Sequence, residues 1–366
     1  MLLRILRSKL FIFALVLLAL SASLYAYRQP LLERIIQVAV GHRLSVSNAS
    51  YLPDGLHVAL CGAGSQFLVD PKRSEPCVLV LAGQQLFVVG AGNKSTQIIE
   101  SMNFGAGEVK AIFLTSLHSY QINGLGQLLN WNWLLAKSDK PLPVLGPKGV
   151  EDVVSSLNQA YFIDSRYKLS TLNPKNVSEF SYGGRPITIQ FEKPDDVATI
   201  SKTNDLEILA FQVNPATDAA SLGYIFRYKG RSALITGDVS KNANFVHRAK
   251  GVDLLVHDAL SPVLMQAYLN GAVKSGLTHV SDLFSTIMTQ HTSPEEAAQT
   301  ASRAAVKYLL LSGITPPLQL PGAEGIFMGQ AKKIYQGPIK IGVDGDVVSM
   351  PAYSDEFNLR NLITRF

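Results

Sequence analysis

The chain has 366 residues, of which 47% are hydrophobic and 17% are charged, and its formal net charge at pH 7 is +5. This composition fits a globular protein with an added membrane segment, and the lack of internal repeats and low-complexity tracts excludes repeat proteins and disordered low-complexity chains. Part of the positive charge lies in Arg4, Arg7 and Lys9 at the N-terminus, so the charge does not by itself indicate a nucleic-acid-binding protein.

An uncharged segment, Leu10–Tyr27, follows these basic residues. Two interpretations are open: an uncleaved signal anchor, or a signal peptide cleaved near Ser21–Ser23 or Ala26. The segment is at the short end of the roughly 20 apolar residues that a spanning helix needs. The residues at its end resemble an interfacial belt, which favours the anchor: Tyr25, Tyr27 and Arg28. Both interpretations place the rest of the chain beyond a bacterial inner membrane, in the periplasm.

The sequence divides into four predicted parts. Residues 1–28 form the signal anchor or signal peptide, and residues 29–50 form a connector that is helical because apolar residues recur at helical spacing over Arg28–Val46. The main domain covers residues 51–353, and residues 354–366 form a tail.

Within the main domain, short apolar segments and helical patterns alternate along the chain. Strands are predicted over Leu56–Leu60, Cys77–Ala82, Gln85–Val89, Ala111–Leu114, Leu142–Leu145, Leu206–Val213, Gly223–Tyr228, Ser232–Ile235, Val252–Val256 and Val306–Leu311, with a closing hairpin over Ile339–Met350. Helices are predicted over Ser95–Met102, Leu128–Leu135, Val150–Tyr161, Ala243–Ala249 and Pro294–Ala305. The stretch Asp164–Thr203 lacks a clear pattern and is interpreted as a peripheral flap. This alternation predicts an α/β protein with two sheets and outer helices.

The two cysteines, Cys61 and Cys77, flank a predicted two-strand unit. Exported chains can keep disulfides, so a bridge between the two is one interpretation. Two buried free thiols are the other, and the sequence leaves both open.

One strand and its loop suggest a family. The strand Ala111–Leu114 leads into the polar loop Thr115–Gln121, followed by Asn123–Gly126. This stretch resembles the metal-binding loop of the metallo-β-lactamase superfamily. Further stretches support the resemblance in chain order: Leu60–Gly64, Ser221–Tyr224, Thr236–Asp238, Leu254–Ala259 and His291–Ala298. The resemblance covers residues 55 to 350, is closest to the tRNase Z and arylsulfatase-like branch, and implies an αββα sandwich.

The resemblance also implies a two-metal centre whose ligands are histidine and carboxylate side chains. Matched by position, only His118 and Asp238 keep a ligand type. The other ligand positions hold different residues: Ser116, Tyr120, Gln121, Asn214 or Pro215, and Gly313. Gly90 replaces an aspartate that supports the centre in the family. The expected metal site is therefore degenerate.

Four residues are candidates for chemistry, each with a plainer alternative. His118 and Asp238 are candidate metal ligands, but His118 could be an ordinary loop histidine and Asp238 could cap a following helix. Asp238, His257 and His291 are candidate catalytic residues, and the two histidines could instead support or pack against the pocket.

These departures lead to two functional hypotheses. The first is a membrane-anchored, non-catalytic binding protein without a cofactor. Its partners would be the inner membrane, through the N-terminal helix, and an unknown small molecule or protein, but no nucleic acid. The second is a residual metal-dependent hydrolase of phosphate or sulfate esters, with zinc held by His118, Asp238 and His291. The missing ligands favour the first.

Overall fold

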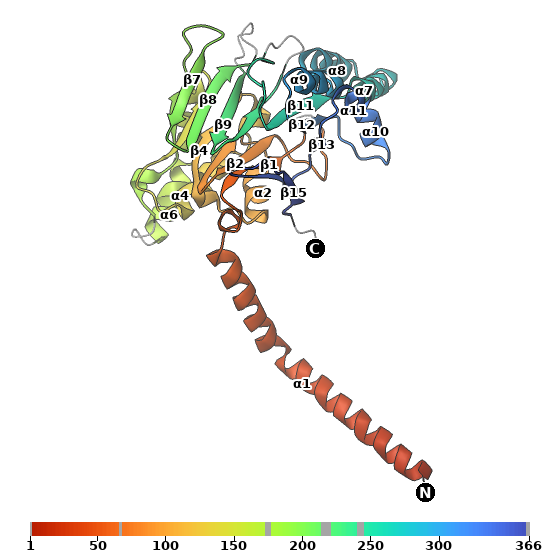
Figure 1. The fold of residues 1–366 in the computed structure, drawn as a ribbon. Coiled ribbons are helices and arrows are strands. Elements are labelled where there is room, and N and C mark those ends of the chain that lie inside the picture. The colour runs from red at the N-terminus through yellow and green to blue at the C-terminus, as the bar shows by residue number, and fades with distance from the viewer. Residues whose placement is uncertain (1, 66–67, 173–176, 214–220, 240–244, 364–366) are drawn as a thin grey trace. The chain divides into compact units, whose positions relative to one another are not determined.

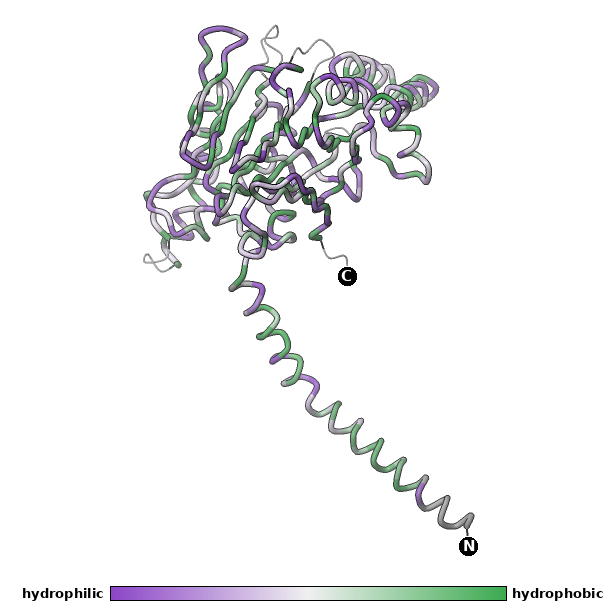
Figure 2. Tube along the Cα trace, viewed as in Figure 1, coloured by the Kyte–Doolittle hydropathy of each residue, from purple (hydrophilic) through white to green (hydrophobic). Residues whose placement is uncertain are grey.

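The computed structural model describes residues 2–65, 68–172, 177–213, 221–239 and 245–363. It contains two units, Met1–Ser47 and Asn48–Phe366. The described part of the first unit is one helix, α1 (Leu2–Ser45), in which the predicted connector continues the apolar segment. Its stretch Phe11–Arg43 is long and apolar enough to cross a membrane (Figure 2). Signal sequences can have the same length and apolar composition. The anchor, the domain boundaries and the periplasmic location therefore remain predictions.

The second unit contains two mixed sheets (Figure 1). The strand order of the eight-stranded sheet is β15 (Asn358–Asn361), β14 (Asp346–Pro351), β1 (Gly55–Gly62), β2 (Cys77–Ala82), β3 (Gln85–Val89), β4 (Val109–Phe113), β5 (Leu142–Gly146) and β6 (Gly184–Thr188). The order of the seven-stranded sheet is β13 (Ile339–Ile341), β12 (Tyr308–Thr315), β11 (Leu254–Leu260), β10 (Arg231–Ile235), β9 (Leu222–Tyr228), β8 (Leu206–Gln212) and β7 (Val197–Lys202).

The helices lie outside the sheets. Those of the first half are α2 (Ser95–Ser101), α3 (Ser119–Ile122), α4 (Leu125–Leu135), α5 (Val150–Ala160) and α6 (Phe162–Thr171). Those of the second half are α7 (Pro262–Lys274), α8 (Thr278–Gln290), α9 (Pro294–Arg303), α10 (Ala323–Met328) and α11 (Ala331–Ile334). Short 3-10 turns cover Asn48–Ser50, Ala106–Glu108 and Glu179–Ser181. The predicted αββα sandwich is thus confirmed.

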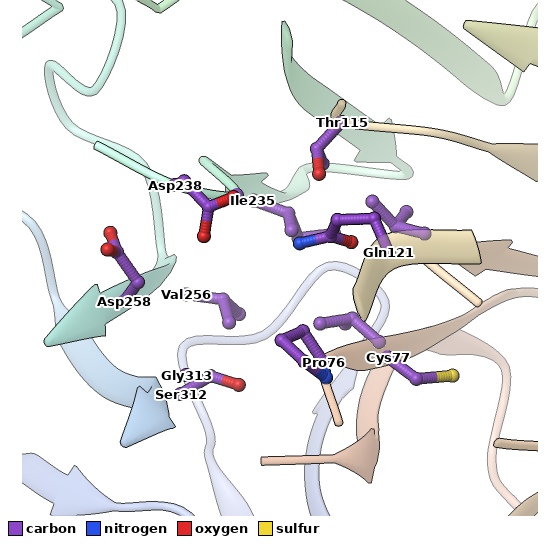
Figure 3. Close-up of a pocket in the computed structure, with 13 residues that line it drawn as sticks. Pro76, Cys77, Thr115, Gln121, Ile235, Asp238, Val256, Asp258, Ser312 and Gly313 are labelled. Carbon is purple, nitrogen blue, oxygen red and sulfur yellow. The ribbon is translucent and has the colours of Figure 1, made fainter. Parts of the chain in front are cut away.

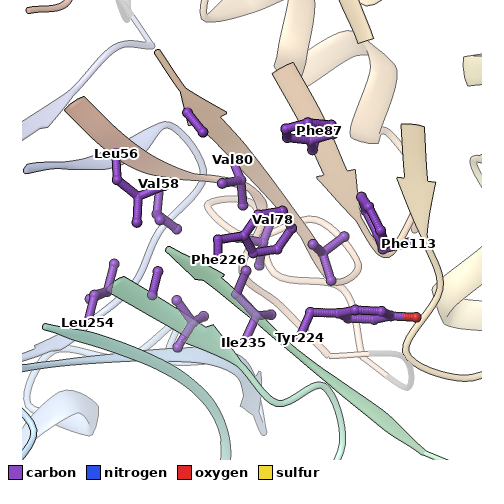
Figure 4. Close-up of a cluster of buried hydrophobic side chains, with 14 of the residues drawn as sticks. Leu56, Val58, Val78, Val80, Phe87, Phe113, Tyr224, Phe226, Ile235 and Leu254 are labelled. Carbon is purple, nitrogen blue, oxygen red and sulfur yellow. The ribbon is translucent and has the colours of Figure 1, made fainter. Parts of the chain in front are cut away.

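The main core lies between the two sheets (Figure 4). Aromatic side chains join them at its centre: the ring centroids of Phe113 and Tyr224 are 5.2 Å apart, and those of Phe87 and Phe226 are 5.9 Å apart. Two further apolar clusters bind the helices to the outer faces of the sheets. Strands such as β1 and β11 are buried along their whole length, which explains why they read as continuous apolar segments.

Three sequence predictions are wrong in detail. The segment Ile339–Met350 is not a hairpin, because β13 pairs with β12 in one sheet and β14 pairs with β1 in the other. Asp164–Thr203 is not a simple flap, since it supplies α6 and the edge strands β6 and β7. The predicted helix Ala243–Ala249 lies partly outside the described residues, and its described part forms turns.

The structure joins Cys61 to Cys77 in a disulfide, which decides between the two interpretations of these cysteines. The bridge links β1 to the start of β2 with the Cα atoms 4.8 Å apart. Both side chains are buried.

We expect removal of this disulfide to lower the free energy of unfolding by about 3 kcal/mol. A bridge that closes a loop of about 15 residues reduces the conformational entropy of the unfolded chain, and this effect is worth about 3 kcal/mol. Urea unfolding of the double variant Cys61→Ala/Cys77→Ala, compared with the oxidised protein, measures the difference. Equal free energies of unfolding would contradict the expectation.

Candidate metal centre

The candidate site is a cavity of about 30 Å³ where strands of both sheets end (Figure 3). Strands β10, β11 and β12 are parallel neighbours, so their carboxyl ends meet at one edge of the sheet. Asp238 follows β10, and Asp258 lies near the end of β11. The cavity is lined by Pro76, Cys77, Val78, Val89, Thr115, Gln121, Ile235, Gly237, Asp238, Val256, Asp258, Ser312 and Gly313.

Three side chains at this edge can share a metal ion. One ligand atom from each of Asp238, Asp258 and His291 lies within 4.8 Å of the others. Nδ1 of His291 lies 3.1 Å from Oδ2 of Asp258, while Oδ1 of Asp258 accepts a hydrogen bond from the backbone N–H of Val239. His291 ends α8, and its neighbour Thr292 accepts a hydrogen bond from the backbone N–H of Leu260 in β11. These contacts hold the imidazole beside the strand ends.

The electrostatics of this group favour a cation. Burial raises the pKa of Asp238, and the neighbouring carboxylate of Asp258 raises it further against the opposing effect of His291. Burial alone would lower the pKa of His291, but the hydrogen bond to Asp258 and the charges of both carboxylates outweigh it, so the pKa rises. Carboxylate oxygens and an imidazole nitrogen that lie this close together are ligand types that divalent metal ions bind.

The loop after β4 contributes differently from the family pattern. The hydroxyl of Tyr120 donates a 2.6 Å hydrogen bond to Oδ2 of Asp238. Burial and the charge of Asp238 raise the pKa of Tyr120, so the phenol keeps its proton. His118 is exposed, stacks on Tyr120 with ring centroids 5.4 Å apart, and is not part of the three-residue group. The role of His118 as a metal ligand therefore stays a prediction.

His257 points away from the cavity. Neighbouring residues of a strand face opposite sides of the sheet, so Asp258 faces the cavity while His257 faces the helix layer. There its ring lies 5.7 Å from that of Phe245, and its Nδ1 lies 2.6 Å from the backbone oxygen of Asp258. Packing, the plainer alternative, accounts for these contacts, and a catalytic role for His257 stays a prediction.

The remaining substituted positions lie around the cavity. Gln121 and Gly313 line it. Ser116 is buried and follows the lining residue Thr115 in the sequence. An ideal Cβ at Gly90 would lie 2.5 Å from Oε1 of Gln121, so the missing side chain at Gly90 makes room for the glutamine. Asn214 and Pro215, and the segment that Asp238 could cap, lie outside the described residues.

Asp258 is the residue whose role sequence reasoning missed. It stands in the quoted stretch Leu254–Ala259, but no function was assigned to it. The sequence did contain a signal. Asp258 lies near the end of a predicted buried strand, and the strand before it in the chain ends near Asp238. Adjacent parallel strands bring such residues together.

The fold and the site define the class of this protein. The family model described as the metallo-beta-lactamase superfamily matches residues 71–276. The chain therefore belongs to the metallo-beta-lactamase superfamily.

Among individual proteins, the chain is similar to ribonuclease Z of Mycolicibacterium gilvum, with 28% identity over 291 residues that cover 79% of this chain and 94% of the relative. It is 29% identical to ribonuclease Z of Mycobacterium bovis over 297 residues, covering 79% of this chain and 96% of the relative. The crystal structure of the short form of human tRNase Z shares the fold, with a TM-score of 0.54 and 20% identity, covering 81% of this chain and 99% of that one.

These relatives correct the functional hypothesis. The prediction of a non-catalytic binding protein with no nucleic-acid partner is wrong, because the relatives that cover most of the chain are named as ribonucleases. The expectations of inactivity and of no cofactor are likewise unsupported. The prediction of inactivity rested on the ligand positions that lack a histidine or carboxylate. It did not consider Asp258, which lies close enough to Asp238 and His291 for the three to hold a metal ion.

Proposed function

We propose that this chain is a metal-dependent phosphodiesterase that hydrolyses RNA, with its metal held by Asp238, Asp258 and His291. The observation that carries the proposal is the convergence of these three ligand atoms within 4.8 Å at a strand edge of a metallo-beta-lactamase fold. The relatives named ribonuclease Z support RNA as the substrate class.

The donor set fits zinc, the ion expected from the resemblance. Catalytic zinc sites combine three protein ligands, drawn from imidazole and carboxylate groups, with an open position for water. Two carboxylates and one imidazole meet that requirement. Burial is the main cause that raises the pKa of Asp238, so a cation bound beside it would favour the charged carboxylate.

A metal bound here would lower the pKa of a water molecule and stabilise negative charge on the attacked phosphate. The protein's own groups orient the ligands. The hydroxyl of Tyr120 fixes Oδ2 of Asp238, and Nδ1 of His291 lies 3.1 Å from Oδ2 of Asp258, where one ion would meet both atoms. The sheet edge thereby holds three donors whose positions are set before substrate arrives.

Cleavage of labelled RNA by the full-length protein in detergent tests the proposal. We expect no cleavage after chelation and recovery on adding zinc or manganese. His291→Ala should slow the recovered reaction at least about 100-fold, since changes around a metal site cost about 10–100-fold even when no ligand is lost. His279→Ala, an exposed histidine on α8, should match the wild type. Intact RNA under every metal condition would contradict the proposal.

A further inference from the structure

A second cavity lies beside the candidate metal centre. Its volume is about 570 Å³, within the range of roughly 300–1,000 Å³ that is usual for ligand pockets. Its walls are the loop after β5, the first turn of α5, the end of β6 and the facing ends of β8 and β9. We refer to it as the side cavity.

The side cavity is joined to the metal centre through Ser221 and Leu222. Leu222 lines the cavity, and its backbone N–H donates a 2.7 Å hydrogen bond to the backbone oxygen of Thr115. The hydroxyl of Ser221 donates a 2.9 Å hydrogen bond to the backbone oxygen of Asp238. An RNA strand whose phosphate meets the metal ligands can therefore reach the side cavity with a neighbouring nucleotide.

The charge of the lining favours a neutral group over a phosphate. Among the described residues that line the side cavity, only Lys148 and Glu151 are charged, and their charges cancel. The hydroxyl of Thr188 donates a hydrogen bond to Oε1 of Glu151, and this bond lowers the pKa of the carboxyl, which therefore stays ionised at neutral pH. A phosphate inside the cavity would meet this carboxylate, whereas a nucleobase carries no charge for it to repel.

The side chains of the lining match the parts of a nucleobase. Phe191 is half-buried, packs against the core between the sheets, and offers a ring on which a base can stack. The carboxylate of Glu151 has about four lone-pair positions, so the hydrogen bond from Thr188 leaves it able to accept another. The amides of Gln190 and Gln212 also line the cavity and can both donate and accept. An aromatic face beside donors and acceptors is how proteins recognise an unstacked base.

Lys148 adds a cation for the RNA backbone. Its side chain is exposed and forms no ion pair with another described residue. The lysine side chain is long and flexible, so it can meet a phosphate outside the cavity while the base lies inside. Contacts of this kind position a strand without reading its sequence.

We propose that the side cavity binds an unpaired nucleobase of the RNA substrate and selects bases that carry an amino group, such as adenine and cytosine, over uracil, which has none. Glu151 accepts the hydrogen bond from the amino group, as carboxylates do from N4 of cytosine. A base that is paired in a duplex stays stacked and uses its amino group in pairing, so the cavity also selects single-stranded RNA. The inference rests on the proposed function, from which it takes RNA as the substrate.

Binding of short, fluorescently labelled RNA to the full-length protein in detergent and chelator, followed by fluorescence anisotropy, tests the inference. We expect oligoadenylate and oligocytidylate to bind at least about 5-fold more tightly than oligouridylate, the lower end of the discrimination that one well-matched base contact gives. Glu151→Ala should remove this preference by weakening only the two amino-bearing RNAs. The matched control is Asp152→Ala, an exposed neighbour on α5 that does not line the cavity, and it should keep the preference.

Phe191→Leu separates stacking from packing, because leucine remains apolar against the core but has no aromatic face. It should weaken binding of every single-stranded RNA at least about 5-fold and leave binding of a fully paired duplex unchanged. Lys148→Ala should weaken binding of every RNA and reduce its salt dependence. Lys140→Ala, an exposed lysine before the start of β5, should have no effect.

Three results would overturn the inference: equal affinities for the three oligonucleotides, a preference that survives Glu151→Ala, or unchanged binding of single-stranded RNA by Phe191→Leu. Because binding is measured without metal, its outcome does not depend on cleavage. A protein that binds these RNAs as expected but cleaves none when metal is added would refute the proposed function and leave the side cavity as an RNA-binding site.

Discussion

Asp238→Asn is expected to abolish metal-dependent RNA cleavage while leaving the protein folded. The change removes the charge of a carboxylate that lies in the three-residue group and lines the cavity. Loss of a ligand should reduce the cleavage rate at least about 100-fold at subsaturating metal. Asp282→Asn, an exposed aspartate on α8, should cleave at the wild-type rate.

The stability of this variant provides the internal check. Because the pKa of Asp238 is raised in the folded protein, ionising it costs stability at every pH above its ordinary value of about 4. Asparagine resembles the neutral acid, so metal-free Asp238→Asn should unfold at an equal or higher temperature than the metal-free wild type at neutral pH. A lower unfolding temperature would contradict the account of this carboxylate.

Asp253→Ala is expected to cost about 3–5 kcal/mol of stability, since it leaves a buried positive charge without its partner. The guanidinium of Arg231 is 1% exposed and lies 3.7 Å from Asp253, which also lies 3.0 Å from Nζ of Lys307 and accepts a hydrogen bond from the backbone N–H of Ser232. Urea unfolding measures the loss.

A matched control uses the same lysine. Asp355 pairs with Lys307 at 2.7 Å but is 88% exposed, so Asp355→Ala should cost less than about 1 kcal/mol. Similar losses of unfolding free energy in the two variants would show that the buried ion pair between Arg231 and Asp253 adds nothing to stability.

Local patterns predicted local structure well. The helix predicted over Pro294–Ala305 is α9, and its capping box between Ser293 and Glu296 is present. The strands predicted over Cys77–Ala82 and Gln85–Val89 also form, and they pair as an antiparallel hairpin. In both cases the residues that decide the structure lie a few positions apart.

The wrong predictions depended on distant contacts. Nothing local in Ile339–Met350 says that its halves join different sheets, a crossing fixed by hydrogen bonds from Gly342 to Leu311 and from Gly345 to Leu60. Helices α7 and α8 have no counterpart in the sequence prediction.

The candidate site shows the same division. Asp238 was found because it stands in a motif, and His291 because it opens another. Asp258 was missed because its role appears only when β10 and β11 lie side by side. His257, one position earlier, was chosen instead, although the alternation of a strand turns it to the other face.

The most direct test measures bound metal and RNA cleavage in the same samples of full-length, chelator-treated protein as metal is added back. The account predicts that cleavage is absent without metal. Cleavage should rise in proportion to the metal bound by Asp238, Asp258 and His291, which His291→Ala removes. Cleavage that persists in the metal-free protein, or no cleavage when that ion is fully bound, would contradict it.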